Sequence, residues 1–69
     1  MKTITWTTTD LTRTEIESIL GADCISKIEG RPSPVGSARV GAVAAWDAND
    51  RELHAAYASL AVQLNRSLP

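Results

Sequence analysis

Cysteine and histidine are almost absent from this sequence. Among its 69 residues, Cys24 is the only cysteine and His54 the only histidine. An intramolecular disulfide is therefore excluded, and a zinc site within one chain is not expected, because structural zinc needs four ligands that are mostly Cys or His. We predict a cytoplasmic protein with no metal ion and no cofactor.

Aromatic residues and long apolar runs are also scarce. Two tryptophans, one tyrosine and no phenylalanine make up 4% of the chain. No apolar stretch approaches the roughly 20 residues of a membrane span, and the first residues do not resemble a signal peptide. We expect residues 1–69 to form one small domain. Because a domain of this size buries only about 60% of its unfolded surface, a protein partner or a second copy would stabilise it.

Charge of one sign does not dominate. The seven basic and eight acidic residues give a net charge of −1 and are spread along the whole chain. Proteins that bind nucleic acid through several phosphates usually carry a basic stripe, so nucleic acid as the main ligand is disfavoured. The neighbouring carboxylates at Glu15 and Glu17, and at Asp47, Asp50 and Glu52, suit helix N-termini better than general acid–base chemistry. We therefore predict that the protein is not an enzyme.

The clearest local motif is a capping box at Thr12 and Glu15, in which each side chain accepts a hydrogen bond from the other residue's backbone N–H. It predicts a helix over 13–20 that ends at Gly21. A second helix is predicted from a cap at Asn49 to the end of the chain. On this second helix a buried stripe is expected, formed by Leu53, Ala56, Tyr57, Leu60 and Leu64.

Three other segments are interpreted as strands. Residues 2–8 alternate apolar and hydroxyl side chains, 23–29 has a weaker pattern that also fits a helical turn, and 38–46 is apolar on both faces. Alanine favours helix over strand, so a helix is the rival interpretation of 38–46. The proline- and glycine-rich residues 30–37 are expected to be a loop.

These elements predict an α+β fold in the order β-α-β-β-α. The second and third strands would form a hairpin across the 30–37 loop, and both helices would pack on one face of a small antiparallel sheet. The hairpin tip is then the candidate surface for a protein partner, since loops carry function on rigid scaffolds. The residues assigned to it are Arg31, Ser33, Val35 and Arg39.

The back of the last helix is a second candidate surface. Small residues there would allow another helix to approach closely, and we expect an isologous homodimer with antiparallel helices. The residues assigned to self-association are Arg51, Ala55, Ala58, Val62 and Arg66.

The function predicted from these features is that of a small protein-binding module or inhibitor. Small, acidic chains without catalytic residues are typical of phage- or mobile-element-encoded proteins that inhibit a host protein, including host defence proteins. A nucleic-acid-binding or regulatory domain using Lys27, Arg31 and Arg39 is the alternative. A third hypothesis is an enzyme whose site forms between subunits from His54, Tyr57 or Asp47.

Overall fold

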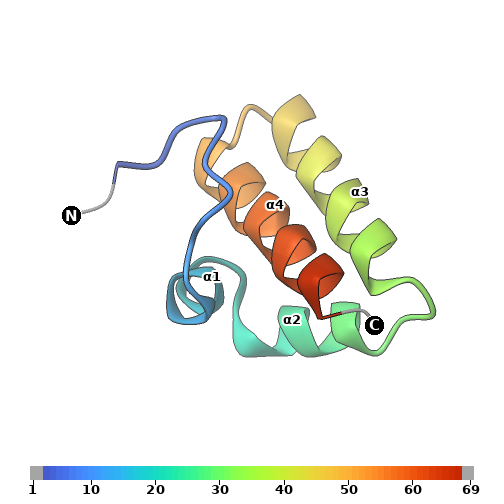
Figure 1. The fold of residues 1–69 in the computed structure, drawn as a ribbon. Helices are drawn as coiled ribbons and strands as arrows, with labels where there is room; N and C mark the ends of the chain where they lie inside the picture. The colour runs from blue at the N-terminus through green and yellow to red at the C-terminus, as the bar shows by residue number, and fades with distance from the viewer. Residues whose placement is uncertain (1–2, 68–69) are drawn as a thin grey trace.

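The computed structural model describes residues 3–67, and this part of the chain contains four helices and no strand (Figure 1). The predicted α+β fold with an antiparallel sheet is therefore wrong, and the protein is all-helical over the described residues. The helices, in chain order, are α1 (Arg13–Leu20), α2 (Ala22–Glu29), α3 (Pro34–Asp47) and α4 (Arg51–Arg66).

The first predicted helix is confirmed with its bounds. The Glu15 N–H donates to Thr12 Oγ1 over 3.2 Å, and the Thr12 N–H donates to Glu15 Oε1 over 2.9 Å, which completes the capping box. Leu11, which precedes the cap, and Ile16, at the fourth helical position, are both buried, as in a hydrophobic staple. The helix ends at Gly21, whose φ of 87° is a left-handed value that favours glycine.

The strand predicted over 23–29 is a helix. Ile25 and Ile28 are both buried, so their spacing of three residues is the helical spacing that the sequence also allowed. Asp23 lies in the first turn and Lys27 in the last turn, where their charges complement the helix dipole. Arg13 of α1 links the two short helices through a bidentate ion pair with Glu29, at 2.9 and 3.3 Å.

The strand predicted over 38–46 is also wrong, and the rival interpretation as a helix is correct. The helix begins at Pro34, where the fixed φ of proline suits the first helical position. The loop predicted over 30–37 is thus shortened to 30–33. Gly41 lies in the middle of this helix because the Tyr57 ring packs directly on it: a Cβ at Gly41 would lie 2.5 Å from two ring carbons.

Without the other two strands, the first predicted strand has no sheet to join. Of residues 2–8, Lys2 lies outside the described part of the chain. Residues 3–12, which precede α1, are called the arm, and they contain a turn at Trp6 and Thr7. The Thr8 N–H donates to the Thr5 carbonyl over 3.2 Å and closes this turn. The turn hydroxyls hydrogen-bond one another instead of forming an exposed row along a strand.

The arm is tied to α4 further along, at Leu11. The Leu11 N–H donates to the buried Ser59 Oγ over 3.2 Å, and Gln63 Nε2 donates to the Leu11 carbonyl over 2.7 Å. Both backbone groups of this buried residue are therefore satisfied by α4, as buried polar groups require.

The last helix begins one residue later than predicted. Asp50, not Asn49, is the N-cap, and its Oδ1 accepts from the Leu53 N–H over 3.1 Å. Asn49 instead takes a left-handed φ of 60° that reverses the chain after α3. The helix ends at Arg66, and the predicted end at Pro69 lies outside the described residues.

The core forms around α4, which packs against α1 on one side and against α3 on another (Figure 1). Its large buried side chains come from the first, second and fourth helices and from the end of the arm: Leu11, Ile16, Ile25, Ile28 and Leu60. In contrast, α3 buries only three alanines: Ala38, Ala42 and Ala45. Small side chains allow the backbones of α3 and α4 to approach closely.

Candidate functional site

The outer face of α3 carries the largest exposed apolar side chains among the described residues. Val40 is 70% exposed, Val43 62% and Trp46 55%. These residues recur every three positions, so they share one side of the helix, away from the buried alanines. We call these three residues the α3 strip.

A strip of this kind calls for an explanation. Single exposed apolar residues are normal on a protein surface, but contiguous ones mark interaction sites. A helix that is apolar on both faces is usually covered on both. Among the described residues, α4 packs on the alanine side of α3, and the strip stays largely exposed.

An aromatic cluster holds one end of the strip. The ring of Trp46 lies 4.8 Å from that of Trp6 and 5.2 Å from that of His54 (centroid to centroid), both in edge-to-face geometry. The cluster joins the arm, α3 and α4, so Trp46 is fixed in position although half of it is exposed. His54 Nδ1 is buried in it and has no hydrogen-bond partner among the described residues.

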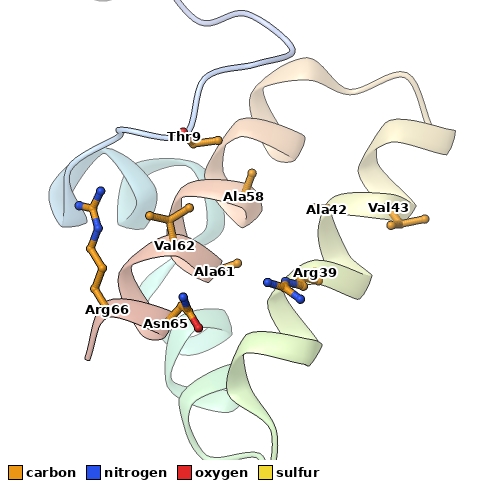
Figure 2. Close-up of a pocket in the computed structure, with 9 residues that line it drawn as sticks. All are labelled: Thr9, Arg39, Ala42, Val43, Ala58, Ala61, Val62, Asn65 and Arg66. Carbon is orange, nitrogen blue, oxygen red and sulfur yellow. The ribbon is translucent and has the colours of Figure 1, made fainter. Parts of the chain in front are cut away.

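A groove of about 490 Å³ runs between α3 and α4 beside the strip, and Val43 belongs to both (Figure 2). Its floor is apolar and mostly alanine. Its two charged lining residues are arginines, one from each helix. The groove is lined by Thr9, Arg39, Ala42, Val43, Ala58, Ala61, Val62, Asn65 and Arg66.

The residues predicted for self-association are divided by the fold. Ala58, Val62 and Arg66 line the groove. Ala55 is completely buried in the core, where it has no surface to offer a second copy, and Arg51 is exposed in the first turn of α4. The back of α4 is thus partly covered within the chain itself, by α3 and by the arm.

The residues predicted for a hairpin tip are not at a tip, because the flanking strands are helices. Arg31 and Ser33 lie in the α2–α3 connection and line a second hollow of about 600 Å³. Val35 is half-buried in the first turn of α3, and Arg39 lines the α3–α4 groove instead. The four residues therefore do not form one surface.

The residues named in the other two hypotheses are also dispersed. Lys27 and Arg31 line the same hollow, but Arg39, the third predicted phosphate contact, does not. Of the residues named for an enzyme site, His54 belongs to the aromatic cluster and Asp47 lies at the end of α3. Tyr57 has its hydroxyl 3.7 Å from Cys24 Sγ, and this contact, with partial burial, raises the pKa of Tyr57 above its usual value.

Sequence reasoning missed the α3 strip because it placed Val40 and Trp46 on one strand face and Val43 on the other. Read with helical spacing, the same residues fall on one side. Trp6, which belongs to the segment 2–8 predicted as a strand, is part of the aromatic cluster beside the strip.

Comparisons with protein-family models, with curated proteins and with solved structures found no match to this chain. Among residues 3–67, no helix is long and apolar enough to cross a membrane. The same residues contain no group of three or more His, Cys, Asp or Glu side chains arranged to hold a metal ion.

Proposed function

We propose that this protein is a binding module whose partner, another protein, packs on the α3 strip. The observation that carries the proposal is the exposure of Val40, Val43 and Trp46 on one side of a helix whose buried side is only alanine. Tryptophan is among the residues most enriched at the centres of protein interfaces.

The strip is well suited to binding because it is held rigidly. Its helix packs along its length on α4, and the Trp46 ring is fixed by Trp6 and His54. A preorganised surface loses little side-chain entropy when a partner binds. Since the strip is a surface and not an enclosed cavity, we infer that the protein acts by occupying a surface of its partner, as an inhibitor or an adaptor does.

The test is affinity capture from a lysate of the cells that naturally produce this protein. The bait is the tagged wild type or one of two tagged variants. Val40→Glu places a charge in the strip, outside the α3–α4 groove. Ser26→Glu makes the same change of charge at an exposed position of α2 and serves as the control. We expect the wild type and Ser26→Glu to capture one stoichiometric protein, and Val40→Glu to lose it while keeping the same far-UV circular dichroism.

Capture that is unchanged in Val40→Glu would refute the proposal. The capture is repeated after nuclease treatment and at two salt concentrations, because binding through phosphates weakens steeply with added salt. Loss of the partner under both treatments would favour the nucleic-acid alternative.

A further inference from the structure

The groove beside the α3 strip has the shape of a binding site for a third helix. Its α4 wall is a continuous helical row of Ala58, Val62 and Arg66, spaced four residues apart. The α3 wall contributes Ala42 and Val43, and Figure 2 shows the two walls side by side with the groove open between them. Alanines on the floor let another helix approach at the usual packing distance of about 8–10 Å.

The charges of the groove restrict what can lie in it. Figure 2 shows Arg39 reaching from α3 toward α4 and Arg66 at the far edge of the α4 wall, and the lining contains no carboxylate. Neither arginine has an ion-pair partner among the described residues, in contrast to Arg13, which pairs with Glu17 and Glu29. The groove is therefore locally cationic in a chain whose net charge is −1.

We propose that the groove binds an amphipathic helix of the partner protein, with an apolar ridge on the floor and carboxylates along both flanks. An apolar helix face lying in an apolar groove is a common mode of peptide recognition. The flanking carboxylates would meet Arg39 and Arg66, and such complementary charges fix the orientation and exclude wrong partners. This inference rests on the proposed function, and Val43 makes the groove and the strip one continuous surface.

A second copy of this chain fits the groove poorly. In a two-fold symmetric dimer with groove against groove, Arg39 and Arg66 of both copies would meet in one interface without a carboxylate among the lining residues. Like charges placed together across an interface are unfavourable. The charge pattern thus favours an acidic helix from a different protein over self-association.

The test is selection from a displayed library of amphipathic helical peptides against the full-length protein. Each peptide has about four turns and apolar residues at positions i, i+3, i+4 and i+7, and its flanks vary among Glu, Gln and Lys. We expect selected peptides to carry Glu on both flanks. Recovery of no binder, or of binders with neutral or basic flanks, would overturn the proposal.

A charge exchange then locates the binding site. In the double variant Arg39→Glu/Arg66→Glu, affinity for a selected acidic peptide should fall about tenfold or more, and a Lys-flanked peptide should become the better ligand. Lys27→Glu/Arg51→Glu changes the net charge equally outside the groove and should bind as the wild type does. Equal losses in both double variants, or no loss in either, would contradict the assignment.

Two further results separate this inference from the proposed function. If the native partner is lost by Val40→Glu but retained by Arg39→Glu/Arg66→Glu, the binding module stands and the acidic helix is wrong. Sedimentation of the wild type that shows a dimer, dissociated by the same double variant, would identify a second copy as the occupant and would also overturn the inference.

Discussion

The two longest helices, α3 and α4, use their apolar side chains in opposite ways. In α4 the side chain of Leu60 is completely buried, and the helix is covered by α1, α3 and the arm. In α3 the buried residues are alanines, and the three large apolar side chains of the α3 strip are exposed. Large apolar residues normally lie inside. The comparison indicates that α4 forms the centre of the core, and the exposed apolar side chains of α3 support the proposal that this helix contacts another protein.

The largest effect expected from this contrast is on stability. Leu60→Ala removes a fully buried side chain from α4 and should lower the free energy of unfolding by about 2–5 kcal/mol. Since a core of this size supplies only about 3–5 kcal/mol, the variant should be largely unfolded. Val40→Ala on α3 should change stability by no more than about 0.5 kcal/mol. Urea denaturation followed by circular dichroism measures both, and similar losses would abolish the distinction between the helices.

A smaller effect is expected at Gly41, where the Tyr57 ring of α4 packs directly on α3. A methyl group there would lie 2.5 Å from the Tyr57 ring, so Gly41→Ala should force the ring to move. Overpacking costs about 1–3 kcal/mol, against a gain of up to about 1 kcal/mol from the better helix propensity of alanine. We expect a net loss in thermal denaturation.

The control for that variant is Gly36→Ala on the same helix. The added methyl group would approach only the side chain of Ser33, at 2.9 Å from Oγ, and this hydroxyl can rotate away. It should therefore leave stability unchanged or raise it by up to about 1 kcal/mol, the propensity gain of alanine. If Gly41→Ala proved as stable as Gly36→Ala, the close packing of α3 on α4 would be refuted.

An effect of similar size concerns the attachment of the arm to α4. Ser59→Ala removes the acceptor of the buried Leu11 N–H and should cost about 1–3 kcal/mol, near the lower end because the hydrogen bond is long at 3.2 Å. Amide hydrogen exchange at Leu11 should become faster. Ser18→Ala, at an exposed position of α1, is the matched change and should leave both measurements as they are. Unchanged exchange in Ser59→Ala would show that Ser59 does not hold the arm.

The parts of the fold that could be predicted are those fixed by short-range contacts. The cap of α1 needs only Thr12 and Glu15, three residues apart, and the sequence therefore predicted its bounds correctly. The start of α4 was misplaced by one residue because Asn49 and Asp50 are both good caps. For 38–46, the Ala and Val residues fit either period, and Gly41, a poor helix former in the middle of the segment, weighed in favour of a strand.

The candidate site was predicted only in part, for a related reason. Three of the five residues assigned to self-association line the groove, since the α4 helix was recognised and its faces follow from helical spacing. Arg39 also lines it, although it was assigned to a hairpin. The α3 strip was missed because a strand interpretation separates Val40 from Val43.

The sequence by itself determined where α1 begins, which residues of α1 and α4 repeat at helical spacing, and the absence of an internal disulfide. These properties depend on neighbours within about one turn of the chain, or on composition. Only the tertiary structure decided that Ala55 is completely buried, that Trp46 meets Trp6 and His54, and that two arginines line one groove. These contacts join residues far apart in the sequence, and which face of a helix they cover depends on how all the helices share one small core.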